Sequence, residues 1–269
     1  MKTFFYTIII VLICSLTSCS EYQKLLKSSD YELKFNKAIE YYNKKKYIQS
    51  QTLLDDISTY YKGTERSQEV LYYLAKSYFG QKNYSSCSEY FKTYMRTFAK
   101  GAYAPEAKYM IGHCYYLDSP EARLDQAITL QGIKALQEFV DMYPEDERVP
   151  TAVAEQDELS NRLAYKELMS AKLYYNLGNY MGNNYLAAVA TAQNALKQYP
   201  ATTHKEALLF LILEAKYAQA VNSIDEKRAE RYQETVDEYY SFINEFPAGK
   251  SRNAADKIFK ESNKIVEKK

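Results

Sequence analysis

Apolar residues recur along this chain every three or four positions, which is the period of an α-helix. Leu74 and Tyr78 lie four residues apart, as do Cys87 and Phe91, so each pair falls on one face of a helix. A polar break over residues 80–83 separates the two pairs. The pattern therefore predicts a hairpin of two short helices, each with one apolar face.

The order of residues in this hairpin repeats along the chain. Gly112 and Tyr115 stand 37 positions after Ala75 and Tyr78. This order of small and aromatic residues resembles the tetratricopeptide repeat, a two-helix unit of about 34 residues. A hairpin this short cannot bury its apolar faces alone and needs further copies beside it. The resemblance therefore implies a stack of such hairpins.

An aromatic residue closes each predicted copy. These residues are Tyr61, Phe98, Tyr143, Tyr199 and Phe246. Proline follows the last three; it cannot continue a helix and disfavours helical geometry in the residue before it, so these marks predict helix ends. Residues 254–269 would form the capping helix that solenoids need for solubility. We expect an all-α fold, an α-solenoid of about five tetratricopeptide-like hairpins with a C-terminal cap.

Composition agrees with this fold. The 269 residues include only 8 glycines and 6 prolines, and 26% of them are charged, which favours helices over strands. The chain also has 29 tyrosines and no tryptophan. Because tyrosine combines a large apolar ring with a polar tip, it suits surfaces that are half buried or that bind extended peptides.

The N-terminus has the pattern of an export signal. Lys2 precedes an apolar run over residues 4–16, which is too short to span a bilayer. The run leads into Leu16, Thr17, Ser18 and Cys19, which resemble the lipobox of bacterial lipoproteins. This resemblance implies that residues 1–18 are a cleaved signal peptide and that the Cys19 thiol carries lipid, palmitate included. The alternative is an ordinary secretory signal whose cleavage leaves a free or bridged cysteine.

Charge gives no sign of a nucleic-acid partner. Removing residues 1–18 takes away Lys2 alone among the charged residues, so the 34 basic residues that remain balance the 34 acidic ones. A nucleic-acid binder needs a basic stripe, and we expect no such partner. The last helix is basic, at Lys257, Lys260, Lys264, Lys268 and Lys269. It is either a solvated surface or a contact with acidic lipid or an acidic partner.

Candidate catalytic residues are scarce. The chain has two histidines, His113 and His204. Cys114 follows His113 directly, so on a helix their side chains point about 100° apart and cannot act as nucleophile and base on each other. No cysteine and histidine cluster has the spacing of a metal site, and no glycine-rich phosphate loop is present. We expect no enzyme, no metal and no cofactor.

Two cysteines remain in the mature chain besides Cys19. Cys87 and Cys114 fall at small interior positions of successive repeats. In an exported chain two thiols can pair, but a buried cysteine also packs as a small hydrophobe. The sequence leaves both states open.

Three further motifs sharpen the resemblance. Residues 139–144 read FVDMYP, residues 174–180 read YYNLGNY and residues 195–200 read ALKQYP. Together with the lipobox and the repeats, they resemble the BamD family, lipoproteins of the outer-membrane β-barrel assembly machine. The similarity covers nearly the whole mature chain. This chain departs from the familiar form of the family in an insertion over residues 182–185 and in its high tyrosine content.

This resemblance implies a non-catalytic scaffold, anchored by lipid in the outer membrane and facing the periplasm. In the family the C-terminal repeats contact periplasmic domains of the barrel-forming BamA-type subunit. The N-terminal repeats are linked with recognition of unfolded outer-membrane protein segments. The alternative function is that of another lipid-anchored tetratricopeptide adaptor of the periplasm, serving cell-wall division or polysaccharide uptake.

Both the repeats and the resemblance suggest how the chain is divided. We expect a signal peptide over residues 1–18 and a lipidated tether over 19–32. Residues 33–146 would hold repeats 1–3 and recognise clients. Residues 147–269 would hold a linking helix, repeats 4–5 and the cap, and would serve complex assembly.

Stacked hairpins leave a concave surface lined by the first helix of each pair. Projecting the repeat onto this chain places eight side chains there: Phe35, Tyr42, Tyr72, Lys76, Phe79, Tyr109, His113 and Tyr116. A row of aromatic rings suits an extended chain whose alternate residues are aromatic. The competing interpretation is that half of the row simply packs between helices.

A Cys19→Ala change tests the lipid anchor. Without the thiol no acyl chain can be attached, and each buried methylene of such a chain contributes about 0.8 kcal/mol to membrane binding. We expect the variant to move from the membrane fraction to the soluble periplasm. Retention of the variant on membranes would count against anchoring by lipid.

Overall fold

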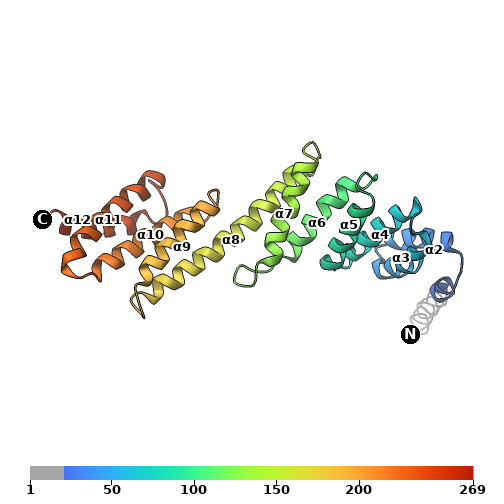
Figure 1. Ribbon diagram of the computed structural model, residues 1–269, viewed down its shortest axis with the longest axis horizontal. Helices are drawn as coiled ribbons and strands as arrows, with labels where there is room; N and C mark the ends of the chain where they lie inside the picture. Colours follow the sequence, from blue (N-terminus) through green and yellow to red (C-terminus); the bar gives the residue numbers. More distant parts are fainter. Residues whose placement is uncertain (1–20, 269) are drawn as a thin grey trace, which may run out of the picture. The chain divides into compact units, whose positions relative to one another are not determined.

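A computed structural model describes residues 21–268, so the predicted signal peptide, including Leu16, Thr17 and Ser18, and the proposed anchor Cys19 lie outside the described residues. All regular secondary structure in the described part is α-helical, which confirms the all-α prediction. Figure 1 shows these helices with the labels used below. Within the same residues, no helix combines the length and the apolar character needed to cross a bilayer.

The hairpins predicted from the repeat pattern are present. The N-terminal half of the chain contains α2 (Tyr31–Asn43), α3 (Tyr47–Tyr61), α4 (Arg66–Gly80), α5 (Tyr84–Thr97), α6 (Ala104–Asp118) and α7 (Ala127–Met142). They are followed by α8 (Val149–Leu177), α9 (Asn184–Gln198), α10 (Lys205–Val221), α11 (Asp225–Glu245) and α12 (Arg252–Val266). Successive helices pack against each other from α2 to α6 and from α9 to α12, as a solenoid requires.

Contacts divide the chain into two compact units. The first comprises the described chain up to Asp118 together with Lys134–Ala152, and the second comprises Ser119–Ile133 together with the chain from Val153 onward. The predicted division into residues 33–146 and 147–269 follows the order of the repeats instead, and it stays a prediction.

Helix ends lie where the sequence pattern places them. At the start of α2 the Asp30 carboxylate accepts a hydrogen bond from the Leu33 N–H at 2.9 Å, which is a typical N-cap. The N–H groups of Phe98, Tyr199 and Phe246 donate to carbonyls four residues back, at the C-caps of α5, α9 and α11. These three predicted aromatic stops are therefore confirmed as helix ends.

The end of the predicted tether packs onto the first hairpin. Residues 21–26 are helical, and Leu25 and Leu26 contact the first core cluster. The ammonium group of the buried Lys34 donates to the Leu26 carbonyl at 3.0 Å and also pairs with Asp56. Tyr22 packs on the same cluster. These three apolar residues span little more than one helical turn, which is too short a stretch to establish a period, so this helix was not predicted.

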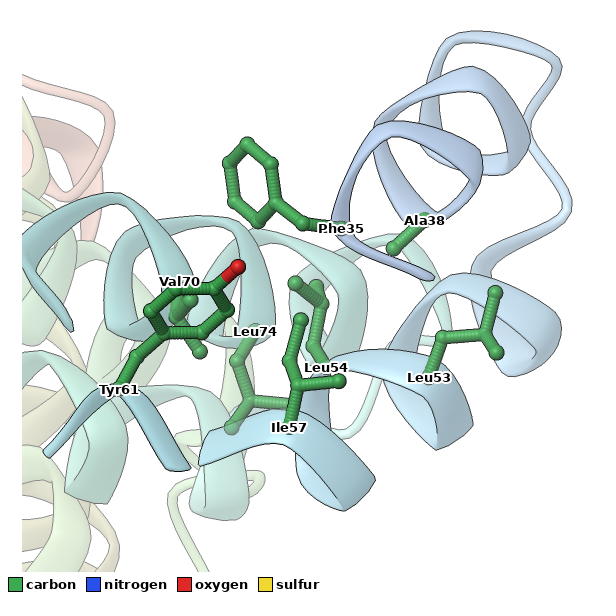
Figure 2. Close-up of a cluster of buried hydrophobic side chains, with 8 residues drawn as sticks. All are labelled: Phe35, Ala38, Leu53, Leu54, Ile57, Tyr61, Val70 and Leu74. Carbon is green, nitrogen blue, oxygen red and sulfur yellow. The ribbon is translucent and has the colours of Figure 1, made fainter. Parts of the chain in front are cut away.

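The first core cluster shows how one hairpin is completed by the next. Figure 2 shows its eight buried side chains: Phe35 and Ala38 of α2, Leu53, Leu54, Ile57 and Tyr61 of α3, and Val70 and Leu74 of α4. Burying a valine- or leucine-sized side chain contributes about 1.5–3 kcal/mol. Because Val70 and Leu74 belong to the second repeat, the first hairpin has no complete core without it.

Close packing in the third repeat depends on a glycine. A Cβ placed on Gly112 of α6 would lie 2.7 Å from the Leu136 Cδ2 atom and 3.0 Å from the Leu136 backbone nitrogen in α7. Ala75, at the equivalent position of the second repeat, is fully buried. The small residue of the repeat pattern thus allows the two helices of a hairpin to approach each other.

The second unit is built on a long helix. The sequence pattern predicted a linking helix leading into the first helix of repeat four, and α8 continues through both without a break. It is followed by Gly178, whose φ of +56° favours glycine. The small side chains of Ala192 and Ala195 in α9 then pack in one core cluster with Leu168 and Ala171 of α8.

Helix α12 is the predicted cap. The Phe259 ring stacks on Tyr239 of α11 with centroids 4.4 Å apart, and the Tyr239 hydroxyl donates to Asp256 at 2.8 Å. Ala255 is fully buried, whereas Lys257 and Lys260 are exposed. The helix therefore covers the apolar surface of α11 with one face and presents charge on the other.

Replacing Gly112 with alanine tests the close approach of α6 and α7. Alanine is the better helix former by roughly 1 kcal/mol. Even so, we expect the variant to lose about 1–3 kcal/mol of unfolding free energy, because the new Cβ would press on Leu136. Urea unfolding measures the difference. As a control, Lys134→Ala on the exposed face of α7 should change stability by less than ~0.5 kcal/mol. A Gly112→Ala protein as stable as wild type would contradict the packing described above.

Candidate functional site

The eight side chains predicted to bind peptide lie on the first helices of three successive hairpins, a set that we call the A-helix face. They are Phe35 and Tyr42 on α2, Tyr72, Lys76 and Phe79 on α4, and Tyr109, His113 and Tyr116 on α6. Phe35, Tyr72 and Tyr109 are buried, with exposed fractions of 8% or less, and the other five are half-buried. Part of the row therefore packs between helices, and the rest reaches the surface.

A hydrogen-bonded ion pair joins α4 to α6. The Lys76 Nζ atom lies 2.7 Å from Glu106 Oε1, and the Tyr72 hydroxyl donates to Glu106 Oε2, also at 2.7 Å. The two side chains of the ion pair are 22% and 28% exposed. Both oxygens of one carboxylate are thus engaged, one by a cation and the other by a hydroxyl.

Burial and hydrogen bonding shift the pKa values in this group. Burial acts to raise the pKa of Glu106, but the hydrogen bonds from Lys76 and Tyr72 outweigh it, and the pKa is lowered. Burial acts to lower the pKa of Lys76, but the hydrogen bond and charge of Glu106 raise it. Burial, followed by the hydrogen bond to Glu106, raises the pKa of Tyr72. At neutral pH Lys76 and Glu106 are therefore both charged and compensate each other.

Further rings hold the ion pair in place. The Tyr72 ring stacks on Tyr103 with centroids 4.0 Å apart. Tyr42 reaches across from α2 to Tyr73, at 5.4 Å between centroids. Tyr72 is thus fixed both by its ring and by its hydroxyl, while Tyr42 keeps part of its surface in contact with solvent.

Four more members of the A-helix face form a second cluster of rings. His113 lies 5.6 Å from Phe79, 5.3 Å from Tyr109 and 6.2 Å from Tyr116 between ring centroids. The Tyr109 hydroxyl is also 3.3 Å from His113 Nδ1. Phe79 comes from α4 and the other three from α6, so the cluster spans the junction of the second and third repeats.

Phe35 joins neither group. Its ring packs edge-on against Tyr61 at 6.4 Å, and the Arg66 guanidinium carbon lies 4.6 Å from its centroid. The side chain is only 4% exposed. It therefore serves the core of the first repeat, and the part of the A-helix face open to a peptide lies on the half-buried residues Tyr42, Lys76, Phe79, His113 and Tyr116.

Sequence reasoning missed Glu106 and Tyr103, which organise this face. Glu106 follows Pro105 in the first turn of α6, 34 residues after Tyr72 and 30 after Lys76. In stacked hairpins, residues separated in the sequence by about one repeat come into contact. A negative residue about one repeat after the positive Lys76 was therefore the signal that could have identified Glu106.

Two hollows are lined by residues that do not belong to the A-helix face. One of about 1140 Å³ in the first unit is lined by Glu32, Tyr60, Tyr61, Arg66, Glu69 and Phe98, among others. The other, of about 640 Å³, lies in the second unit and is lined by residues that include Glu121, Arg123, Glu158, Tyr165, Met169 and His204. Neither was predicted, because each combines residues from helices and loops that the repeat pattern does not relate.

The loop before α7 forms one wall of the hollow in the second unit. The Arg162 guanidinium donates to the Ser119 carbonyl at 2.7 Å, and Lys166 donates to the Leu124 carbonyl at 2.8 Å. Tyr165 lies between these two residues in the sequence of α8. Its ring packs against the ring of His204, with centroids 5.0 Å apart. Burial, and then the charge of Lys172, lower the pKa of His204, so this ring is neutral at pH 7.

No residues within 21–268 form a group of three or more His, Cys, Asp and Glu side chains that could hold a metal ion. The side chains that the face and the hollows do offer are aromatic rings, paired charges and half-buried hydroxyls. Such groups bind peptide and protein surfaces.

Comparison with known proteins gives a family match. The family model described as "YfiO: Outer membrane lipoprotein" matches residues 28–232. The outer membrane protein assembly factor BamD of Caulobacter vibrioides is 29% identical over 119 residues, which are 44% of this chain and 37% of that protein. The chain thus matches well under half of that relative's length.

Among solved structures, the TPR2AB-domain:pHSP90 complex of yeast Sti1 is similar to this chain. The two are 13% identical, and the alignment covers 87% of this chain and 99% of the other, with a TM-score of 0.41. A likeness at this score carries no weight for function.

A Glu106→Gln variant tests the ion pair through its pH dependence. Because the folded-state pKa of Glu106 is lowered, its ionised form adds stability above the unfolded-state pKa, near 4.5, and this contribution is lost as the pH falls through the folded-state value. Allowing for partial exposure, we expect the variant to lose about 0.5–1.5 kcal/mol at pH 7. The difference should shrink towards pH 3.

Urea unfolding at a series of pH values measures this effect. Glu89→Gln is the matched control, because Glu89 pairs with Lys92 but is 67% exposed, and it should change stability little at any pH. Equal, pH-independent losses in the two variants would contradict the role given to Glu106.

Proposed function

Because the chain belongs to the YfiO family of outer membrane lipoproteins, we propose that it is a non-catalytic scaffold of the outer-membrane β-barrel assembly complex. The observation that carries this proposal is the family match over residues 28–232, which takes in all the helices from α2 to α10. The name of the Caulobacter relative, an outer membrane protein assembly factor, supports the same role.

We propose that the first repeats bind unfolded outer-membrane protein segments through the A-helix face. Its half-buried rings at Tyr42, Phe79 and Tyr116 lie on successive first helices. Rings that are already fixed by neighbours lose little entropy on binding. The Lys76–Glu106 pair adds polar groups without net charge. This surface suits an extended segment that alternates aromatic and polar side chains.

We propose that the second unit docks the periplasmic domains of a barrel-forming BamA-type subunit. The hollow around Tyr165 and His204 supports this choice. Tyr165, which lines the hollow, is 43% exposed, and Leu124, which follows the lining residue Arg123 in the chain, is 54% exposed. Glu121 and Arg123 line the same hollow and supply charges of both signs. Exposed aromatic and aliphatic side chains next to polar groups are typical of protein interfaces.

The raised pKa of Cys114, the one cysteine that adjoins a histidine in the sequence, supports a scaffold over an enzyme. The Cys114 thiol donates a hydrogen bond to Cys87, and this bond together with burial raises its pKa. A catalytic cysteine needs the opposite shift, towards the thiolate. Cys114 is therefore not placed as a nucleophile, and we propose that the protein acts by binding.

We propose that lipid on Cys19 holds the protein in the outer membrane, facing the periplasm. The packing of residues 21–26 on the first hairpin supports a short connection between anchor and repeats, because Lys34 binds the Leu26 carbonyl. Only one residue, Ser20, would then separate the lipid-bearing cysteine from the helical segment. The first repeats would lie close to the membrane surface.

Co-purification after mild detergent extraction tests the proposed complex. We expect a barrel protein with periplasmic domains among the partners, identified by mass spectrometry, and we expect depletion of the chain to lower the level of outer-membrane barrels. Normal barrel levels after depletion, or partners from cell-wall or polysaccharide-uptake machinery only, would replace this proposal with the adaptor alternative.

The two proposed binding surfaces can be separated by mutation. A Phe79→Ala/Tyr116→Ala variant should bind an unfolded outer-membrane protein segment about tenfold more weakly, equivalent to about 1.4 kcal/mol, and still co-purify with the barrel subunit. Tyr165→Ala should do the reverse. Fluorescence titration and co-purification measure the two effects.

Ile48→Ala is the control for both measurements, since Ile48 is 65% exposed on α3 and lies outside both surfaces. It should leave client binding and co-purification unchanged. Loss of both activities in either variant, at unchanged stability, would show that the two surfaces are not separate.

A further inference from the structure

Two buried thiols meet between the second and third repeats. Cys87 of α5 and Cys114 of α6 are 27 positions apart in the chain, and both side chains are at most 1% exposed. Their sulfur atoms lie 2.9 Å apart, with the Cys114 thiol donating to Cys87. No disulfide joins the two cysteines in the structure.

The spacing of the two sulfur atoms leaves little movement between the thiols and a covalent bond. A disulfide requires about 2.05 Å between sulfur atoms and Cα atoms roughly 4.4–6.8 Å apart. Helices α5 and α6 already pack directly against each other. The sulfur atoms therefore need to approach by only about 1 Å to reach bonding distance, between two helices that are already in contact.

The family membership indicates that the protein matures in an oxidising compartment. Members of an outer membrane lipoprotein family mature outside the cytosol, where disulfides form and persist. We propose that Cys87 and Cys114 form an intramolecular disulfide in the exported protein. This inference uses the family membership and the thiol geometry, and it is independent of the proposed role in barrel assembly.

The oxidant that the proposal requires is a disulfide, either of a protein oxidoreductase or of a small-molecule thiol. One cysteine, as thiolate, attacks the oxidant's disulfide and forms a mixed disulfide, and one oxidant sulfur leaves as a thiolate. The second cysteine then attacks the mixed disulfide at the first cysteine's sulfur and releases the oxidant as two thiols. The two cysteines lose two electrons and two protons, and the oxidant's disulfide gains both.

Burial determines when this exchange takes place. In the folded chain an oxidant has no access to either sulfur, because both side chains are buried. The hydrogen bond and burial that raise the pKa of the Cys114 thiol also keep it from the reactive thiolate form. The exchange therefore occurs during folding, before α5 and α6 close on each other, and the finished bond is protected from reductants for the same reason.

The proposed disulfide would affect the A-helix face. Cys114 directly follows His113, whose ring connects Phe79 of the second repeat to Tyr109 and Tyr116 of the third. A bond from Cys114 to α5 would fix the third repeat against the second at this junction. The bond would thereby limit how far the two repeats can separate when a ligand binds.

Thiol counting on the full chain purified from membranes tests the proposal. The protein is denatured in the presence of a polyethylene-glycol maleimide, once without and once after a reductant, and the additions are counted on a gel. We expect two more additions in the reduced sample than in the unreduced one. A lipid-bearing or unmodified Cys19 adds the same count to both samples and leaves this difference unchanged.

A Cys114→Ala variant is the matched control, because its single remaining buried thiol should add equally in both samples. Peptide mapping of the unreduced wild type should recover residues 87 and 114 in one linked pair, and reduction should lower the melting temperature of wild type by about 5–10 °C but not that of Cys114→Ala. Equal additions to wild type in both samples, or a link from either cysteine to another chain, would overturn the proposal.

Discussion

Burial shared between neighbouring hairpins is the interaction on which the rest of this structure depends. The core of the first hairpin contains Val70 and Leu74 from the second, and the side chains of α11 are covered by α12 through Tyr239 and Phe259. These described hairpins are therefore not complete by themselves, and within each unit neighbouring helices contribute to one another's stability. Inside a hairpin the small residue of the repeat has a separate role, because Gly112 lets α6 approach the Leu136 backbone in α7 and Ala75 is fully buried at the equivalent position.

The same stacking creates the candidate site. First helices of successive repeats lie beside each other, so a residue meets its partner one repeat later, as Lys76 of α4 meets Glu106 of α6. The ion pair is compensated, and the rings around His113 are held by one another. What remains open is a strip of half-buried aromatic and polar groups that a bound segment can use without first ordering them. That property suits a scaffold for unfolded chains.

Much of this architecture could be predicted from the sequence, because the helical period and the aromatic stops are local signals. Asp30 caps the start of α2 with its side-chain carboxylate, and the backbone N–H of Phe98 donates at the end of α5, so both act within a few residues of their own position. Contacts between repeats were harder to predict. Glu106 carries no local sign that it binds Tyr72 and Lys76. Phe35 was expected on the binding surface and lies in the core, since the repeat pattern locates a face of a helix without saying how deeply the neighbouring helix covers it.

Site-specific photo-crosslinking tests the central claim most directly, namely that unfolded outer-membrane protein segments bind along the first helices. A photoreactive residue placed at Phe79, on the A-helix face, should form a crosslink to an unfolded outer-membrane protein. The same residue placed at Glu89, which is 67% exposed on the second helix of that repeat, should form none. Crosslinks from Glu89 alone, or equally from both positions, would contradict the account.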